Sequence, residues 1–396
     1  IVPNEMLITN RVENLSLADP KVWQSTNVAV GYDSDVNLVT RLLLQAAAGQ
    51  ARVLTDPEPA VALMAFGADG LEFRLGYWMG DPENGSDNLR SLINLDILRL
   101  LREHQVEIPL ATRGGIYYYR VRSGNEVSEI SRFQGYPEGT VGDELRVAIV
   151  GDWGGGGKDV RSIIADKVHL LLSAGDNVAN LHEKGKEGIK AYSALIRNNR
   201  ELFRSTPFLP ILGNHDRELT PRGPKPPVHA VYDIEAIAFR EFFALPGDEW
   251  KWYFDFPEFD ARFIALDLNH ITDFGTTWQT CHDWTPGSVQ FKWYAETMAT
   301  TTSGFVFTLM NEKQTTVDGR SKGAWHEHFR RGSALITGFG YFADRAELTG
   351  GLAYYNTCLK GNGSLYIDPK SQFQSSEDNY LLLTFTAGAS KMKIEF

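Results

Sequence analysis

Hydrophobic positions in the first hundred residues switch between the spacing of strands and the spacing of helices. Four apolar stretches predict strands, at residues 23–30, 61–66, 71–78 and 106–109. Apolar residues three and four positions apart predict one helix that carries Val36, Val39, Leu42, Leu43 and Ala46, and a second that carries Leu89, Leu92, Ile93, Ile97, Leu100 and Leu101. The order of elements is therefore strand, helix, two strands, helix, strand.

Local signals agree with this order. Asp33 or Ser34 can cap the first helix and Asp87 the second, because short polar side chains accept hydrogen bonds from the first free N–H groups. Asp69-Gly70 between the second and third strands is a strong hairpin signal. The order predicts a ferredoxin-like α+β domain over residues 21–112, with both helices on one face of the sheet.

The pattern changes abruptly after Arg113. Residues 116–121 and 126–133 predict two short strands, and residues 137–144 form a linker rich in glycine and acidic residues. From residue 145 onward, apolar strands alternate with helices, which is typical of an α/β domain. The sequence therefore predicts a multi-domain chain with a junction near residues 110–116, and it leaves open whether the two parts are a natural fusion.

Composition and charge argue against several classes of function. The chain has 396 residues with 43% hydrophobic and 22% charged content, which suits two or three globular domains. No apolar run reaches the roughly 18 residues of a membrane helix. A net charge of −11 argues against nucleic acid as the main partner. Two cysteines, Cys281 and Cys358, allow one disulfide but no cysteine zinc site.

Polar residues follow three apolar strands of the second part. Asp152 comes after the strand at 145–150, Asp176 after 168–173, and Asn214, His215 and Asp216 after 208–212. Open α/β sheets place ligands at the carboxyl ends of their strands, so these side chains are expected at one edge. Carboxylate and amide oxygens are the donors that hard metal ions prefer.

Residues 1–112 resemble the small-conductance mechanosensitive channel family. The resemblance rests on the order and spacing of five segments, Ile1-Val2-Pro3-Asn4, Val12-Glu13-Asn14-Leu15-Ser16, Val28-Ala29-Val30-Gly31-Tyr32, Asp56-Pro57-Glu58-Pro59 and Glu107-Ile108-Pro109. It implies that residues 1–20 end a channel-type β domain and that residues 21–112 belong to a homo-oligomeric cytoplasmic vestibule. The pore helices of a channel are absent from this sequence, so conduction does not follow.

Residues 114–396 resemble the calcineurin-like metallophosphoesterase superfamily, and most closely its purple-acid-phosphatase-like members. The block Gly213-Asn214-His215-Asp216 and the two upstream aspartates carry the resemblance. It implies fibronectin-like strands at 114–136 and a four-layer α/β sandwich at 145–396. It also implies that Asp152, Asp176 and Asn214 bind metal, and that His215 lies near the leaving group, steered by Asp216.

The sequence departs from that family at four expected ligands. Ala179 stands in place of a tyrosine, and the strand at 304–310 ends in Asn311-Glu312 where the family has a histidine. Phe339 and Tyr341 stand where the family has its last two histidines. The resemblance implies a divalent or trivalent metal such as Mn, Fe, Mg or Zn, and the departures favour a single ion or none.

Several residues keep more than one interpretation. His270, Asn311, Glu312 and Tyr341 are candidates for the cleft. A plain surface turn stays open for His270, and Asn311 either keeps weak oxygen ligation or fills space. His326 and His328 are either substitute ligands or loop histidines. Trp278 and Trp284 are the better cleft candidates among the tryptophans, most of which are expected in the core.

Three functions remain for the second part. The first is a metal-dependent hydrolase of phosphate mono- or diesters with a reduced metal site, acting on a small or polymeric anionic substrate. The second is a binding protein that has lost activity. The third is a repurposed cleft, a lyase or another hydrolase that uses His215 for acid–base chemistry. The phosphatase-like part suggests a periplasmic or secreted location and the channel-like part a cytoplasmic one, so the location stays open.

Overall fold

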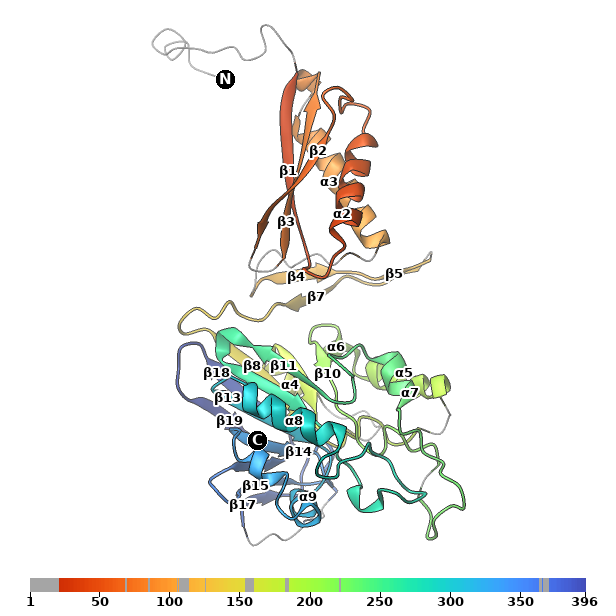
Figure 1. Cartoon of the computed structure of the whole chain (residues 1–396), viewed down its shortest axis with the longest axis vertical. Helices are drawn as coiled ribbons and strands as arrows, with labels where there is room; N and C mark the ends of the chain where they lie inside the picture. The colour runs from red at the N-terminus through yellow and green to blue at the C-terminus, as the bar shows by residue number, and fades with distance from the viewer. Residues whose placement is uncertain are drawn as a thin grey trace. The chain divides into compact units, whose positions relative to one another are not determined.

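The computed structural model describes residues 21–67, 70–84, 86–104, 106, 114–124, 126–153, 160–181, 185–220, 222–362, 365 and 370–396. The chain divides into two compact units, Ile1–Ala111 and Thr112–Phe396 (Figure 1). The two-part architecture predicted from the sequence is confirmed. In the described residues, no helix combines the length and the apolar character needed to cross a membrane.

The first unit is an antiparallel sheet covered by two helices. Its elements are β1 (Val22–Val30), α2 (Val36–Ala48), β2 (Ala60–Phe66), β3 (Leu71–Met79), the 3-10 turn η1 (Pro82–Asn84) and α3 (Ser86–Glu103). The strand order is β1-β3-β2, and the apolar faces of both helices pack on β3 in one core. The five main elements follow the predicted order. Residues 107–109 of the predicted fourth strand lie outside the described residues.

Two local expectations in this unit are wrong. The residue that caps α2 is Asp35, whose carboxylate accepts the N–H groups of Asn37 and Leu38. Asp33 and Ser34 instead belong to the turn before it, in which the N–H of Ser34 donates to Gly31. Leu92, expected inside, is 50% exposed, because its neighbours Leu89 and Ile93 already fill the buried face of α3.

The second unit begins with a β ribbon. Strand β4 (Ile116–Tyr119) pairs antiparallel with β7 (Ser131–Gln134), and β5 (Arg122–Ser123) pairs with β6 (Glu126–Val127). The predicted strand at 126–133 is thus broken in two. Ser128 causes the break, since its hydroxyl accepts the N–H of Val121 and its own N–H donates to Val121.

Two larger sheets form the body of this unit. The first has the order β10 (Phe208–Leu209), β9 (Leu170–Ser173), β8 (Glu144–Val150), β18 (Leu381–Thr386) and β19 (Met392–Glu395). The second has the order β11 (Trp252–Phe256), β12 (Ala261–Ala265), β13 (Phe305–Met310), β14 (Ala334–Thr337), β16 (Ala353–Asn356), β15 (Ala343–Glu347) and β17 (Ser371–Ser375). Strands β8, β9 and β10 run parallel, as do β12, β13, β14 and β16.

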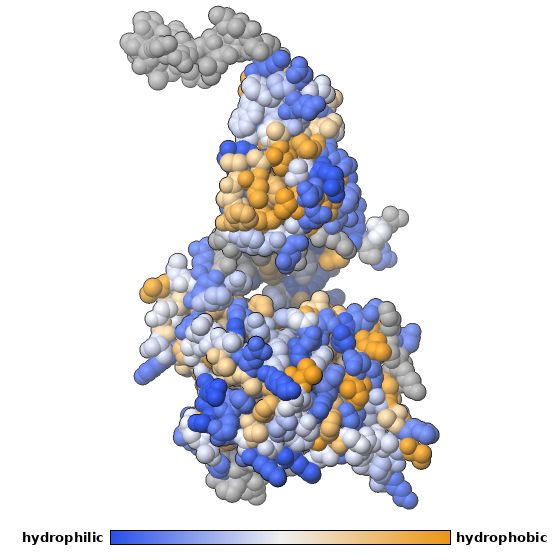
Figure 2. Space-filling view, in the orientation of Figure 1, coloured by the Kyte–Doolittle hydropathy of each residue, from blue (hydrophilic) through white to orange (hydrophobic). Residues whose placement is uncertain are grey.

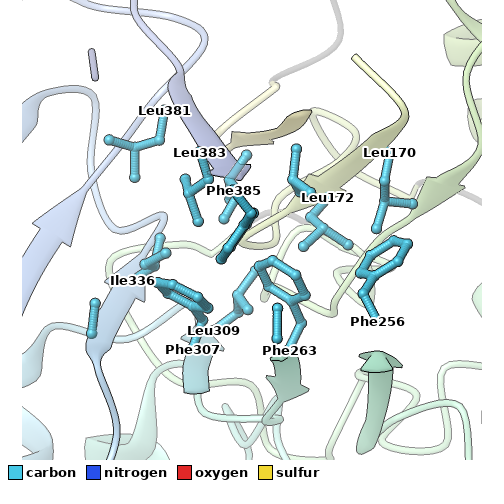
Figure 3. Packing of buried hydrophobic residues seen from close by; sticks show 14 of the residues in the cluster. Leu170, Leu172, Phe256, Phe263, Phe307, Leu309, Ile336, Leu381, Leu383 and Phe385 are labelled. Carbon is cyan, nitrogen blue, oxygen red and sulfur yellow. The ribbon is translucent and has the colours of Figure 1, made fainter. Parts of the chain in front are cut away.

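Successive side chains along a strand point to opposite faces of the sheet and so enter different hydrophobic clusters. Leu170 and Leu172 of β9 point into the core between the sheets, where Figure 3 shows them with Phe256, Phe263, Phe307 and Phe385. Leu171, between them in sequence, faces the opposite side and joins a separate cluster. The unit is therefore an α/β sandwich with a helical layer outside each sheet.

Helices cover the outer face of each sheet. The first sheet carries α4 (Arg161–Ala165), α5 (Ile189–Asn198), α6 (Arg200–Phe203), α7 (Ile237–Phe242) and the 3-10 turn η2 (Gly185–Gly188). The second sheet carries α8 (Val289–Thr300), α9 (Gln314–Ser321), α10 (His326–Phe329) and the turn η4 (Ile271–Asp273). A further turn, η3 (Pro257–Phe259), joins β11 to β12. Both cysteines are buried, and Cys281 and Cys358 form no disulfide.

The ends of the parallel strands meet in close backbone contact. A side chain on Gly151 would place its Cβ 2.3 Å from the carbonyl oxygen of Thr357, and one on Gly338 would place it 2.4 Å from that of Ala174. At Gly213 the Cβ would lie 2.1 Å from the carboxylate of Asp176. Only glycine allows the two sheets to bring their loops together at this edge.

We predict that Gly151→Ala destabilises the second unit by about 1–3 kcal/mol, because backbone atoms of two strands must move apart. Urea unfolding followed by tryptophan fluorescence measures the change, since most tryptophans lie in this unit. Gly319→Ala is the matched control. A Cβ there meets nothing within 4 Å, and the residue lies inside α9, so stability should rise by about 0.5–1 kcal/mol. Equal stability of Gly151→Ala and wild type would contradict the close contact.

Candidate functional site

The strand ends converge on one pocket. Its volume is about 150 Å³, and it is lined by residues that follow β8, β9, β10, β12, β13 and β14: Asp152, Asp176, Asn214, His215, His270, Asn311, Glu312, Phe339, Gly340 and Tyr341. Parallel neighbours end at the same edge, which is why loops far apart in sequence share this pocket. Apart from Asp216, every predicted site residue lines it. Their chemical roles stay predictions.

Two buried carboxyl groups lie at the centre of the site. The side chains of Asp152 and Asp176 interact with each other, and only 3% and 7% of the surfaces of these residues are exposed. Burial and the nearby Asp176 charge raise the pKa of Asp152 to about 9. Burial also raises the pKa of Asp176. Both residues have left-handed backbones, with φ of 44° and 54°, which non-glycine residues seldom adopt. In the absence of a cation, the pair therefore shares a proton.

The loop after β10 supplies an amide and an imidazole. The amide nitrogen of Asn214 donates to Glu218 at 3.0 Å, and its side-chain carbonyl oxygen has no hydrogen-bond partner among the residues that the structure describes. The backbone N–H of His215 donates to Asp176 at 3.0 Å. The His215 ring places Nδ1 2.9 Å from Asn180 Oδ1 and 3.3 Å from Glu218 Oε2. These acceptors hold a proton on Nδ1, so Nε2 is the ring nitrogen available for chemistry.

The expectation that Asp216 steers His215 is wrong. The Asp216 carboxylate is fully buried, and it accepts bonds from the N–H of Gly213 at 2.9 Å and the amide of Asn177 at 3.0 Å. Tyr192 donates to its other oxygen at 3.3 Å. Burial, followed by the charge of Asp176, raises the pKa of Asp216 to about 7. Asp216 fixes the shape of the loop, whereas Asn180 and Glu218 orient the His215 ring.

The remaining pocket residues differ in their exposure and in whether their polar atoms already make hydrogen bonds within the protein. His270 has a side chain 41% exposed, and burial of the ring with repulsion from Arg222 lowers its pKa to about 4. Glu312 uses its carboxylate to accept the N–H groups of Ile271 and Lys313, and burial raises its pKa. Burial, then the nearby aspartates, raises the pKa of Tyr341 to about 12, so its phenol stays protonated.

Asn311 holds backbone rather than a ligand. Its amide nitrogen donates to the carbonyl of Ala174 at 2.9 Å and to that of Gly338 at 3.0 Å, which ties β13 to the ends of β9 and β14. Two residues outside the pocket also have structural roles. His326 contacts the carbonyl of Thr349 through Nε2, and the carbonyl of Trp284 accepts the indole N–H of Trp325.

Sequence reasoning missed Glu218 and Arg222. Glu218 bonds Asn214 and contacts His215, and Arg222 pairs with Glu218 at 3.0 Å and with Asp273 at 2.7 Å. The ring of Trp278 lies 5.7 Å from the Arg222 guanidinium, so this tryptophan supports the arginine. The spacing of four between Asn214 and Glu218 was the available signal, because it fits one turn, in which the N–H of Glu218 donates to the carbonyl of Asn214 at 3.0 Å.

A buried ion pair anchors the loop after β10. Arg217 donates to both carboxylate oxygens of Asp267, at 2.7 and 2.8 Å, and neither side chain is exposed. His282 adds a third contact to Asp267 at 2.7 Å. Burial alone would raise the pKa of Asp267, but Arg217 and His282 outweigh it and lower the pKa to about 2. The pair joins the loop after β10 to the end of β12.

The donor set fits one hard cation better than two. Across the described residues, no group of three or more His, Cys, Asp and Glu side chains could hold a metal ion. The Asp152–Asp176 pair with the free amide oxygen of Asn214 still gives three oxygen donors, and a cation can replace the shared proton. Phe339 offers no donor, and Asn311 already uses its amide nitrogen on backbone carbonyls.

A known protein family matches each of the two parts of the chain. Residues 145–329 match the family model described as calcineurin-like phosphoesterase. Residues 25–108 match the model described as mechanosensitive ion channel MscS, C-terminal. The resemblance of each part to its family is confirmed.

Two curated proteins, both of the mechanosensitive channel type, are similar to part of this chain. An uncharacterized MscS family protein of Haemophilus influenzae is 37% identical over 111 residues, which cover 27% of this chain and 10% of that protein. The mechanosensitive channel MscK of Escherichia coli is 33% identical over 132 residues, covering 33% of this chain and 12% of that protein. The chain thus spans about a tenth of the length of these curated relatives.

Among solved structures, the purple acid phosphatase PPD1 from yellow lupin (Lupinus luteus) seeds has the same fold. Its TM-score is 0.52 at 13% identity, and the match covers 85% of this chain and 64% of that one. At this identity the likeness concerns the fold alone. The second unit is therefore a metallophosphoesterase-like α/β sandwich.

Acid should weaken the second unit through Asp267. Because the folded pKa of about 2 is below the unfolded value of 3.8, the ionised group stabilises the fold above about pH 4. This contribution, about 2 kcal/mol, is lost as pH falls from about 4 through 2. We predict that Asp267→Asn is less stable at pH 7, because Arg217 loses its partner, and that its unfolding free energy changes less between pH 4 and 2. Parallel pH profiles for the two proteins would contradict this role.

Proposed function

We propose that the second unit hydrolyses phosphate esters with a single divalent or trivalent cation. Asp152, Asp176 and the amide oxygen of Asn214 would hold the ion. The observation that supports this most is the contact between two buried carboxyl groups at the bottom of the pocket. Burying two like charges is costly unless a cation or a proton lies between them, and the fold keeps a strained backbone at both positions to hold them there.

His215 is the acid–base group of this proposal. A bound cation would lower the pKa of a coordinated water and neutralise charge on the phosphoryl group. Attack of water on phosphorus forms one P–O bond and breaks the bond to the ester oxygen. His215, held through Nδ1 by Asn180 and Glu218, donates a proton from Nε2 to that leaving oxygen. The backbone N–H of His215 keeps Asp176 in place while this happens.

A metal-free cleft is the second candidate. Two observations favour it: Phe339 and a protonated Tyr341 line the pocket, and Asn311 is committed to backbone carbonyls. In that case Asp152 and Asp176 share a proton and His215 acts as base, which suits a lyase or another hydrolase. In the extreme case of this second candidate, the unit has lost all catalytic activity and keeps the pocket only for binding.

Activity with and without metal separates these functions. We predict that the chain with added Mn²⁺ hydrolyses p-nitrophenyl phosphate or the diester bis(p-nitrophenyl) phosphate, and that chelation of the metal stops turnover. His215→Ala should lower turnover by about 10²-fold with the fold intact, because an acid–base group is lost. His229→Ala is the control, since this histidine is exposed and lies outside the pocket. Hydrolysis that persists after chelation would support the metal-free cleft, and no hydrolysis of either ester would contradict the proposal.

For the first unit we propose self-association through its sheet. Strand β2 is an edge strand with the sequence Ala-Val-Ala-Leu-Met-Ala-Phe, and six of its seven residues are exposed. Figure 2 shows hydrophobic residues gathered over the strands of this unit, and the large exposed ones on β1 and β2 are Trp23, Leu63, Met64 and Phe66. An apolar edge strand that none of the described residues covers favours pairing with another chain. The channel-family match is consistent with a homo-oligomer.

We predict that Leu63→Lys with Phe66→Lys lowers the mass of the particle in solution, because charge replaces the apolar contact at the edge of β2. Light scattering after size exclusion measures that mass. Val228→Lys, at an 87% exposed position of the second unit, should leave it unchanged. A wild-type chain that is monomeric at high concentration would contradict self-association.

A further inference from the structure

A second pocket of the second unit lies at the opposite ends of the strands that carry the candidate site. Its volume is about 240 Å³, and strands β4 and β7 of the ribbon form one wall. The other wall comes from the end of α4 and from the residues just before β9 and β10. Since Asp176 and Asn214 follow those two strands while His169 and Thr206 precede them, the two pockets open at different edges of the sheet.

The ribbon wall is fixed to the body. The hydroxyl of Tyr119 donates to the carbonyl of Arg204 at 2.7 Å, one residue before Ser205 of the pocket. The side chain of Arg204 pairs with Glu129 at 2.9 Å across the same contact. The ring of Phe133 stacks on Tyr117 with centroids 5.3 Å apart, so it is held against the ribbon. The pocket is thus a built feature of the fold.

Cations and hydrogen-bond donors gather in this pocket. Arg132 and Lys167 are exposed at it, and within the described part of the chain neither side chain has a hydrogen-bond or ion-pair partner. The pocket lining contains no acidic residue, although the chain has a net charge of −11. Two unpaired cations on an otherwise acidic protein favour an anion at this place.

Neutral donors lie deeper in the same pocket. Thr206 is 8% exposed, and its hydroxyl has no partner among the residues that the structure describes. His169 accepts the N–H of Arg146 at Nδ1, at 3.1 Å, so its proton is on Nε2. Burial, and then the charge of Arg146, lowers the pKa of His169, which keeps this ring neutral. A hydroxyl without a partner in the lining of a pocket is the kind of group that a ligand oxygen satisfies.

Apart from Gln134 and Ser205, the rest of the lining is apolar: Ile116, Phe133, Ile163, Ile164 and Val168. The volume equals about eight water molecules at 30 Å³ each, which accommodates an aryl or short alkyl group with one acidic headgroup. We propose that this pocket binds a small organic anion whose headgroup contacts Arg132, Lys167 and Thr206 and whose apolar group packs on Phe133 and Ile164. The occupant is separate from the substrate of the candidate site.

Isothermal titration of the full chain with phenylphosphonate, which cannot be hydrolysed as an ester, tests this assignment, with EDTA present so that no cation at Asp152 and Asp176 binds the probe. We expect one saturable site, with inorganic phosphate and phenol each binding at least tenfold more weakly than the joined molecule. The double variant Arg132→Gln with Lys167→Gln should weaken phenylphosphonate binding by at least tenfold. Both side chains are exposed, so the variant should fold, and circular dichroism checks this.

Two control variants locate the bound probe. Arg122→Gln removes an exposed cation of the same ribbon outside the pocket, and it should bind like wild type. Asp152→Asn should also bind like wild type, whereas a loss there would place the probe in the candidate active site and overturn the proposal. Unchanged affinity in the double variant, equal binding of phosphate alone, or no saturation at millimolar probe would each overturn it as well.

Discussion

Close backbone contact at one edge of the two sheets is the constraint on which the site depends. Gly151 lies against Thr357, Gly338 against Ala174, and Gly213 against Asp176, all at distances that leave no room for a Cβ. Asn311 ties the same ends together through two carbonyls. Because the loops cannot spread, the side chains that follow the strands are forced into a pocket of about 150 Å³.

This crowding sets the electrostatics of the site. Asp152 and Asp176 are pressed together with little solvent, which raises the pKa of both carboxyl groups. Such an arrangement opposes folding, and the buried Arg217–Asp267 pair holds the loop after β10 in the position that it requires. A carboxyl pair kept at that cost is best explained by a cation or proton that it must hold.

The sequence allowed prediction of the strands and of the residues that follow them, because apolar runs ending in Gly-Asp or Gly-Asn-His are local signals. It did not allow prediction of partners across the fold. The family resemblance pairs Asp216 with His215, but the loop turns the Asp216 carboxylate toward Asn177, and Glu218 takes that place. Arg217 and Asp267 are fifty residues apart, and nothing local marks them as a pair. Even the α2 cap lies at Asp35, since turn geometry selects among adjacent polar residues.

Metal stoichiometry tests the central claim most directly. The chain is dialysed to equilibrium against Mn²⁺, and bound metal per chain is measured by elemental analysis for wild type, Asp176→Asn and the exposed control Asp283→Asn. We predict one ion per chain for wild type and for the control, and a loss of that ion in Asp176→Asn. Two ions per wild-type chain, or an ion retained by Asp176→Asn, would contradict a single-cation site built on the buried carboxyl pair.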